Sequence, residues 1–397
     1  MSNILIISAV FPPEPLVSAK LSFDIAEVLS KSDKVTVLCP NPSRPKGFDH
    51  NQSTQNVSDK YTINHVDSYT CAESKLIGRI RESYSFGRQC AKFIKANKAN
   101  LQTIYINSWP FISQYLIIKQ ATKSDIKTVL HIQDIYPESL IKKIPKIMGN
   151  FLFKILLPID IFTLKKATKI IGISNRMNLY LSASRKINIE KFYLVRNWQE
   201  DAFFLNFKAS ANINKEFVFM YTGSISASAG VEVLIKSFVK ANLDKTKLII
   251  AGDGAEKEKC VSIAKEIGNN STIEFCNLTP SETPLLQSKA TVLLLPLKKG
   301  IALTATPSKL TAYLLSGKPV LASVELNTDV SEIINEGKCG IVKEPENIDA
   351  IAKGMKEMYF MKTNTLEEMG ANSKKYAENY LSKKVNLKKC VSIIKNI

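Results

Sequence analysis

The 397-residue sequence contains few of the residues that build metal sites and disulfide frameworks. It has three histidines and seven cysteines, and the cysteines are scattered, odd in number and never in a C-x-x-C pair. This composition argues against a disulfide framework and against a zinc site of cysteines and histidines. We expect free thiols, which fit a reducing cytoplasm, and we expect no metal or other cofactor.

Targeting and membrane-spanning segments are also lacking. The apolar run 4–11 has no basic region before it and no small-residue cleavage site after it, so we interpret it as a buried strand. A transmembrane helix needs about 20 apolar residues. The most apolar region, 147–163, is interrupted by Lys154, Pro158 and Asp160, so we do not expect it to span a membrane.

Acidic residues are outnumbered, with 36 Asp and Glu against 54 Lys and Arg, and the net charge is +18. Such an excess predicts anionic partners, which could be nucleic acid, anionic lipid or phosphorylated substrates. The lysines are spread along the chain and no zinc-finger, RRM-like or helix-turn-helix pattern occurs, so we expect no nucleic-acid partner. The G-x-G-x-x-G fingerprint of nicotinamide and flavin enzymes is absent after the first apolar run.

Short apolar runs alternate with helix-period segments along the whole chain. Near-continuous apolar runs predict strands buried on both faces, as in a parallel sheet covered by helices. The alternation is typical of doubly wound α/β domains. The runs are NILIISAVF, KVTVLC, TIYIN, KTVLHIQD, KIIGIS, FYLVRN, FVFMYTG, KLIIAGDG, TIEFC, ATVLLLPL, KPVLAS and GIVKE.

Twelve strands are too many for one open sheet of the usual size, so we predict two Rossmann-like domains. The N-terminal domain is predicted over 1–200 and the C-terminal domain over 201–380, with the boundary in the polar, Asn-rich stretch 197–215. The Lys-rich end of the chain has a helical pattern, and we expect its last helix, about 380–397, to pack back on the first domain.

In an open α/β sheet, ligands bind at the carboxyl ends of the strands, so the residues after each predicted strand are site candidates. The loop FPPEPLVSAK carries three prolines and has a stiff shape. It could direct Glu14 and Lys20 toward an acceptor substrate. Alternatively, it is only a rigid connector.

The segment HIQDIYPES places His131, Asp134, Tyr136 and Glu138 within eight residues at the end of another predicted strand. Carboxylates at such a place can accept a hydroxyl proton or hydrogen-bond a sugar. The alternative is a helix N-terminus with capping acids, and the sequence favours neither.

Two turns in the second half are candidates for binding the donor. In MYTGSISASAG, Gly223 frees the backbone, and Ser224 and Ser226 could cap the next helix and leave an anion site at its N-terminus. A plain strand-turn-helix is the alternative. The AGDG turn offers Asp253 and Gly254, which by themselves are weak evidence.

The most informative segment is LPLKKGIALTATPSKLTAYLLSGKPVLAS. Lys298 follows a predicted strand, and Pro307 begins a predicted helix that continues with Ser308, Lys309 and Leu310. Lysines together with free amides at a helix N-terminus suit a diphosphate. A capped helix with solvated lysines is the alternative, which we consider less consistent with the whole arrangement.

The ordered set of motifs resembles the family-4 retaining glycosyltransferases of the GT-B fold, and within them the WcaI-like and WbuB-like branch of colanic-acid, O-antigen and capsule transferases. FPPEP, VTVLCPNPSRPKG, DIYPES, the GDG turn, and PSKL followed by SGKPVLAS are similar to that branch in order and position. The resemblance extends from about Asn3 to Tyr380. It implies two Rossmann-like domains that face each other across a cleft.

The sequence departs from that pattern in two places. Leu16 and Val17 stand where the branch commonly has two glycines, and Lys20 stands where an arginine is usual. The wider family carries two glutamates eight apart before the GKPV strand, and Thr304 and Ala312 occupy their places. The carboxylate that would hold the ribose hydroxyls of the donor is therefore missing there.

The resemblance also implies a mechanism. The donor nucleotide binds the C-terminal domain and the acceptor the N-terminal one, and retaining transfer needs no protein nucleophile. Backbone amides, Lys309 and Lys298 would stabilise the leaving diphosphate, and a donor phosphate oxygen would take the acceptor proton. On the acceptor side we expect Asp134 and Glu138, supported by Glu14.

The implied donor is a UDP-linked hexose or N-acetylhexosamine, and the implied acceptor is a sugar on a polyprenyl diphosphate. Such an acceptor would place the protein peripherally on the inner, anionic face of the cytoplasmic membrane. The stretch 140–166, with lysines around apolar residues, fits this location, although a core-facing helix with solvated lysines would look similar. A nucleotide-sugar epimerase of the same fold and a non-catalytic assembly scaffold stay open as other functions.

Overall fold

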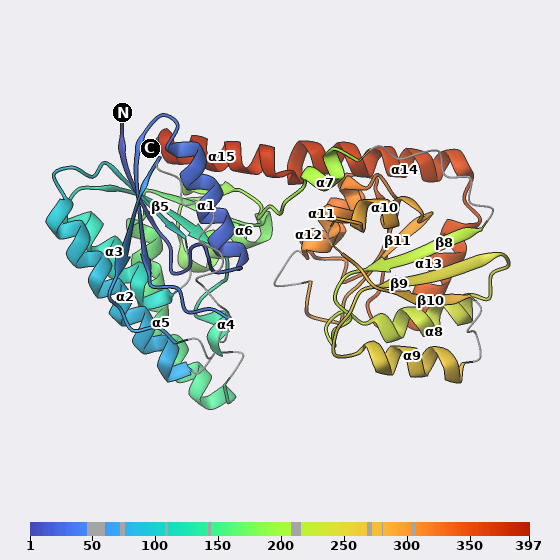
Figure 1. The fold of residues 1–397 in the computed structure, drawn as a ribbon. Coiled ribbons are helices and arrows are strands. Elements are labelled where there is room, and N and C mark those ends of the chain that lie inside the picture. Colours follow the sequence, from blue (N-terminus) through green and yellow to red (C-terminus); the bar gives the residue numbers. More distant parts are fainter. Residues whose placement is uncertain are drawn as a thin grey trace. The chain divides into compact units, whose positions relative to one another are not determined.

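The computed structural model describes residues 1–45, 60–71, 76–107, 110–141, 144–207, 216–267, 272–279, 281–302 and 307–397. The chain divides into two units. The first consists of Met1–Asn197 together with Asn386–Ile397, and the second of Trp198–Val385. Each unit contains one parallel sheet with helices packed on it (Figure 1).

The first unit has a seven-stranded sheet in the order β3-β2-β1-β4-β5-β6-β7. Every neighbouring pair is parallel, and the strand order reverses between β1 and β4. Its strands are β1 (Asn3–Ile7), β2 (Lys34–Pro40), β3 (Thr62–Val66), β4 (Thr103–Asn107), β5 (Lys127–Ile132), β6 (Lys169–Gly172) and β7 (Phe192–Leu194). The edge strand β3 was not predicted, because its half-buried, mixed sequence lacks the continuous apolar run of its neighbours.

Helices cover the first sheet because its residues alternate between two apolar faces. Leu5, Ile7 and Ile106 point into a core shared with α2 and α3, whereas Ile4, Ile6 and Tyr105 are buried outside that cluster. The helices of this unit are α1 (Val17–Leu29), α2 (Leu76–Asn97), α3 (Phe111–Lys123), α4 (Glu138–Ile141), α5 (Lys146–Lys166), α6 (Asn175–Arg185) and the 3₁₀ turn η1 (Ile189–Lys191).

The second unit has a six-stranded parallel sheet in the order β10-β9-β8-β11-β12-β13, which reverses between β8 and β11. Its strands are β8 (Phe217–Thr222), β9 (Thr246–Ala251), β10 (Ile273–Cys276), β11 (Val292–Pro296), β12 (Val320–Ser323) and β13 (Gly340–Lys343). All twelve predicted runs thus form strands, six in each unit.

Two hydrophobic clusters lie on the two faces of this second sheet. Phe219 and Tyr221 point into the cluster that includes α8, and Val218 and Met220 into the cluster that includes α11. The helices are α7 (Ala202–Leu205), α8 (Val231–Ala241), α9 (Lys257–Glu266), α10 (Thr283–Ser288), α11 (Ser308–Leu315), α12 (Asp329–Glu336), α13 (Ile348–Tyr359), α14 (Thr363–Tyr376), the π-helix η2 (Ala377–Leu381) and α15 (Lys383–Lys395), which continues into the first unit.

Lys154, Pro158 and Asp160 interrupt the apolar run 147–163 but not the helix, because α5 is one helix of 21 residues with Pro158 inside it. A proline removes one backbone donor, and packing of α5 on α3 can compensate for that loss. Among the described residues, Ile147–Lys166 is the one helical segment long and apolar enough to cross a membrane by length and composition. Only 22% of its most apolar stretch is buried.

Candidate functional site

The carboxyl ends of β8 and β11 lie where the strand order of the second sheet reverses, which is where open α/β sheets bind ligands. The loop after β8 and the loop that leads from β11 to α11 meet at this place. Lys298 donates its backbone N–H to the carbonyl oxygen of Ser228 (3.1 Å), and the Lys309 ammonium donates to that of Ser224 (3.2 Å). The predicted donor-binding segments are therefore adjacent.

Lys309 is the centre of this arrangement. Its Nζ also donates to the Tyr221 hydroxyl and lies 4.5 Å from the centre of the Tyr221 ring. Its side chain covers Gly223 so closely that a Cβ there would stand 2.4 Å from the Lys309 Cε. Burial lowers the pKa of Lys309 to about 8, so the side chain still carries its charge at neutral pH.

The first turn of α11 adds backbone donors beside Lys309. Pro307 is the N-cap residue, without a side-chain cap, and it has no N–H of its own. The amides of Ser308 and Lys309 begin the helix and so have no intrahelical acceptor. Leu310 is fully buried and anchors this turn in the core. An ammonium and helix amides at one place suit an anionic ligand.

The loop Lys298–Gly300 offers fewer donors than the sequence indicates. Its three successive N–H groups donate to the carbonyl oxygen of Ser228, to a carboxylate oxygen of Glu346 (3.0 Å) and to one of Glu325. These amides hold the loop in place and are occupied. Phosphate contacts at this site would come from side chains and from α11.

The side chain of Lys298 has a partner of its own. Its Nζ lies 3.3 Å from an oxygen of Glu232, in the first turn of α8, and Lys259 pairs with the other oxygen. Hydrogen bonds from both lysines, Lys259 first, lower the pKa of Glu232 although burial acts against them. Lys298 is therefore at the predicted place, but its ammonium group forms an ion pair with Glu232, which the sequence analysis did not single out.

The predicted caps of α8 are not where the sequence places them. The N-cap residue is Gly230, in a left-handed conformation with φ of +68°, and it has no side-chain cap. Ser226 instead lies 3.1 Å, hydroxyl to hydroxyl, from Ser228, so the serines occupy the loop and not the helix start. An exposed loop of this kind leaves the first amides of α8 without a serine cap.

The GDG turn joins two loops by close backbone contact. A Cβ on Gly252 would stand 2.0 Å from the carbonyl oxygen of Gly223, and one on Gly254 would stand 2.4 Å from that of Ile225. The glycines are therefore required by packing. The Asp253 carboxylate is exposed and accepts the N–H of Gly254 (2.9 Å). Contact between Asp253 and the sugar-nucleotide donor stays a prediction.

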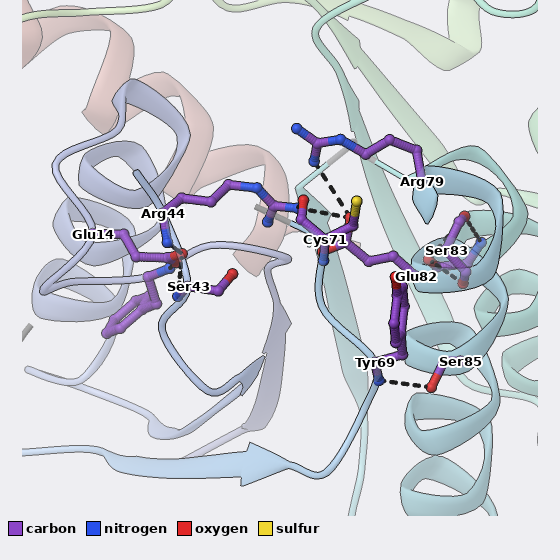
Figure 2. A network of polar contacts seen from close by, with 11 residues as sticks. Glu14, Ser43, Arg44, Tyr69, Cys71, Arg79, Glu82, Ser83 and Ser85 are labelled. Carbon is purple, nitrogen blue, oxygen red and sulfur yellow. Dashed lines mark hydrogen bonds and ion pairs between the residues drawn. The ribbon is translucent and has the colours of Figure 1, made fainter. Parts of the chain in front are cut away.

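In the first unit, Glu14 does not point at solvent. It is 4% exposed, and its carboxylate accepts the backbone N–H groups of Phe11 (3.2 Å), Ser43 and Arg44 (3.0 Å each), as Figure 2 shows for the loop after β2. Burial raises the pKa of Glu14, although these three donors act in the opposite direction. Glu14 thus fastens the loop after β1 to the loop after β2, in place of the expected acceptor contact.

A buried ion-pair network braces the loop after β2 on α2 (Figure 2). Arg44 donates to Glu82 (2.7 Å) and to the carbonyl oxygen of Cys71 (2.8 Å), and Arg79 lies 3.3 Å from the same carboxylate. The side chains of Arg44 and Glu82 are 7% and 5% exposed. Sequence reasoning missed this network because Arg44 lies far along the chain from Cys71 and Glu82, and only Arg79 and Glu82 share a helical spacing.

Glu138 is held in a second network. Arg185 of α6 donates to both of its carboxylate oxygens (2.6 and 2.7 Å), and the Tyr180 hydroxyl donates to one of them (2.7 Å). Burial would raise the pKa of Glu138, but these hydrogen bonds outweigh it and the pKa is lowered. Arg185 also pairs with Asp160 of α5 (2.9 Å). The network joins α4, α5 and α6.

Two further predicted residues, Asp134 and His131, lie at the end of β5 in opposite environments. The Asp134 side chain is exposed just beyond the strand. His131 is fully buried, and its Nδ1 lies 2.7 Å from the Tyr105 hydroxyl. Burial lowers the pKa of His131 to about 4, so the ring is neutral near pH 7. Of the two, only Asp134 is exposed to solvent.

Tyr136 and Lys20 complete the predicted acceptor side. The ring of Tyr136 stacks on that of Phe111, with centroids 5.8 Å apart. Lys20 forms an ion pair with Asp24 (3.1 Å) one turn along α1. Both side chains keep part of their surface exposed, so neither is excluded from contact with a substrate.

Comparison with known proteins identifies the chemistry of the second unit. Residues 203–376 match the family model described as "Glycosyl transferases group 1". The protein is a glycosyltransferase. The enzyme is 22% identical over 280 residues to "Probable glycosyltransferase WbjE" of Pseudomonas aeruginosa, covering 68% of each chain. It is 23% identical over 290 residues to "Putative colanic acid biosynthesis glycosyl transferase WcaI" of Escherichia coli K12, covering 69% of each.

Solved structures confirm the predicted fold class. Anabaena Alr3699/HepE in complex with UDP superposes with a TM-score of 0.70 at 13% identity over 100% of both chains. A glycosyltransferase from Rickettsia africae ESF-5 gives a TM-score of 0.68 at 16% identity, covering 100% of this chain and 98% of that one. WaaG, a glycosyltransferase involved in lipopolysaccharide biosynthesis, gives 0.64 at 14%, covering 99% and 100%. The enzyme therefore has two Rossmann-like parallel-sheet domains of the GT-B type.

Proposed function

We propose that the enzyme is a retaining glycosyltransferase of the family-4 branch that transfers a sugar from a UDP-linked donor to a lipid-linked oligosaccharide. The sugar would be a hexose or an N-acetylhexosamine, and the product a capsule, O-antigen or exopolysaccharide. Support comes from the similarity to a relative named for colanic acid biosynthesis, and from the fold shared with Alr3699/HepE, which was solved with UDP and with UDP-glucose.

The observation that carries the proposal is the position of Lys309 at the start of α11, beside Gly223 and at the strand-order reversal of the second sheet. A diphosphate bound there would meet an ammonium and the first amides of α11. As the bond from the sugar C1 to the diphosphate breaks, these groups would stabilise the charge on the leaving group, and we propose that no metal is needed. The acceptor oxygen would bond to C1, and its proton would pass to a donor phosphate oxygen.

On the acceptor side, we assign the substrate contact to Asp134. Glu14 and Glu138 were expected beside it, but both carboxylates make hydrogen bonds within the protein. Asp134 alone among these three is exposed at the carboxyl end of a strand. A carboxylate in that position would accept a hydrogen bond from an acceptor hydroxyl.

We further propose that α5 rests on the anionic surface of the membrane that holds the lipid-linked acceptor. Ile147 (89% exposed), Met148 (57%), Phe151 (69%) and Ile155 (48%) recur at helical spacing, so they share one exposed face. Lys154, Lys165 and Lys166 are on the same helix, and each basic residue near anionic lipid contributes about 1 kcal/mol. Lys142 and Lys143 lie outside the described residues. Because α5 also packs on α3, it would lie in the interface and not cross it.

The first experiment measures thermal stabilisation of the purified enzyme by a panel of sugar nucleotides, and release of nucleoside diphosphate with and without membrane lipid extract. We expect stabilisation by one UDP-sugar, lipid-dependent release of UDP, and loss of both in Lys309→Met. Lys299→Met, which removes an exposed lysine from the neighbouring loop, is the matched control and should leave both intact.

Other outcomes would refute the proposal. Conversion of the sugar without any acceptor would indicate a nucleotide-sugar epimerase. Absence of stabilisation by every nucleotide would refute a donor site at α11 and indicate an assembly scaffold.

A further inference from the structure

A cavity of about 250 Å³ lies in the first unit, at the amino ends of β1 and β2. Asn3 begins β1, Lys34 begins β2 and Thr36 follows two residues later, and most of the other lining residues come from 93–101, at the end of α2 and in the turn after it. Every neighbouring pair of strands in this sheet is parallel, so the cavity is at the opposite edge from Asp134, which follows β5. It therefore belongs to neither candidate site.

The volume of the cavity limits the size of a ligand. A single water molecule needs only about 10–15 Å³, so several waters or a small molecule can enter. Sites for drug-sized ligands are usually about 300–1,000 Å³, which is more than this cavity provides. A molecule of about one sugar ring is the size that fits.

The polar side chains along the cavity are not used to hold the fold together. Asn3, Thr36 and Asn100 keep exposed surface, and within the described ranges their side chains have no hydrogen-bond partner. Asn97 donates its amide N–H to the carbonyl oxygen of Phe93 (2.9 Å), which leaves its amide oxygen available. Carboxamides and hydroxyls both donate and accept hydrogen bonds, as the hydroxyl groups of a sugar do.

The cavity also has an apolar side and little charge. Phe93 and Leu101 pack against the core of the first unit and line the cavity together with the buried Ile4. The face of an aromatic ring carries partial negative charge, which attracts the C–H groups on the face of a sugar ring. Lys34 is the one charged residue in the described lining, which contains no carboxylate. An uncharged ligand with hydroxyl groups and an apolar face suits these walls better than a metal ion or a phosphate.

We infer that this cavity is a non-catalytic saccharide site that binds one sugar residue of a glycan. The carboxamides and the Thr36 hydroxyl would exchange hydrogen bonds with the sugar hydroxyls, and the Phe93 ring would contact the C–H face. The site would hold a glycan chain on the enzyme without making or breaking a bond. Such binding uses neither Asp134 nor Lys309, so it goes beyond the proposed transfer and can be measured without a donor.

The test titrates methyl glycosides of glucose, galactose and N-acetylglucosamine into the full-length enzyme, labelled with ¹³C at its isoleucine and leucine methyl groups. We expect saturable shifts of the Ile4 and Leu101 methyl signals with at least one glycoside, at millimolar concentrations because a single sugar makes few contacts. Thr36→Val removes the hydroxyl and keeps a β-branched side chain in the strand. It should weaken binding about three- to ten-fold, as expected for one lost hydrogen bond, and so should Asn100→Ala.

Thr62→Val is the matched control, because Thr62 pairs with Thr36 from the neighbouring strand β3 and does not line the cavity. It should bind the glycoside as the wild type does. Absence of saturable shifts with all three glycosides would overturn the inference, as would wild-type affinity in both Thr36→Val and Asn100→Ala, or equal weakening by Thr62→Val. Shifts of the same methyl signals by inorganic phosphate or uridine, in place of the glycosides, would show another class of ligand and would overturn it as well.

Discussion

Two carboxylates at predicted ligand-binding positions, those of Glu14 and Glu138, are used to hold the protein together. Glu14 accepts three backbone N–H groups, and Glu138 pairs with a buried arginine. A buried carboxylate is stable only when such partners surround it, and those partners leave little capacity for a substrate. Asp134, a few residues before Glu138, is instead exposed at the carboxyl end of β5.

This difference predicts opposite phenotypes for two conservative substitutions. Asp134→Asn should lower kcat/KM for the acceptor by about 10²-fold or more, with the melting temperature unchanged, because it removes the carboxylate that we propose contacts the acceptor. Glu138→Gln should lower stability by about 1–3 kcal/mol, because Arg185 loses one of its two charged partners, while kcat changes little. Steady-state kinetics and thermal melts of both variants are the measurements. A catalytic role of Glu138 would appear as lost turnover in a fully stable variant.

His131 makes stability depend on pH. Its pKa is about 4 in the folded protein and about 6.5 when unfolded, so the unfolded chain binds the extra proton first as the pH falls. The contribution is fully present above pH 6.5 and is lost progressively down to pH 4, by about 2 kcal/mol between pH 7 and pH 5. Urea unfolding at the two pH values should show a smaller loss in His131→Gln than in the wild type. Equal losses in both proteins would contradict the assignment.

At the scale of elements, α5 is a continuous helix that contains a proline, charged residues and exposed apolar side chains. Its proline and its charges do not end the helix, because Asp160 is paired with Arg185 and the helix packs on α3 and α4. One of its faces carries large apolar side chains that no part of the described chain covers. Exposure of that kind on a basic protein is typical of a surface that docks on lipid.

The exposed face of α5 predicts binding to anionic vesicles. Phe151→Glu should reduce sedimentation with phosphatidylglycerol-containing vesicles about ten-fold or more, since it replaces an insertable aromatic ring by a charge of the wrong sign. Phe360→Glu, at a position that is 75% exposed in the second unit, is the control and should bind as the wild type does. The proposal fails if both variants lose binding to the same extent.

At the scale of the whole molecule, the two units use the same principle to form their candidate sites. Each parallel sheet reverses its strand order once, between β1 and β4 in the first unit and between β8 and β11 in the second. The first unit contains both ends of the chain, because Asn386–Ile397 belongs to it although this segment follows the second unit in the sequence. Cys390 and Ile394 are fully buried there, and Lys395 pairs with Asp33 (3.1 Å).

Removal of residues 386–397 should therefore weaken the first unit and spare the second. Loss of the buried side chains of Cys390, Ile393 and Ile394 removes several kcal/mol of apolar burial, at about 1.5–3 kcal/mol for each large residue. Hydrogen exchange should show faster opening of β4 and β5, while UDP still binds at α11. Loss of UDP binding together with intact protection of β4 and β5 would contradict this division.

The sequence by itself determined the fold class, because twelve near-continuous apolar runs can be buried only in sheets covered on both faces. It also singled out the segment around Lys309 that we propose binds the donor, since a lysine beside a helix start is a local feature that needs no distant partner. Only the tertiary structure decided which carboxylates are exposed, which loop amides are occupied and that Glu325 reaches Gly300. These facts depend on contacts between residues far apart in the chain, and no local spacing records them. The edge strand β3 was missed for a related reason, because it is stabilised by pairing with β2 and not by its own pattern.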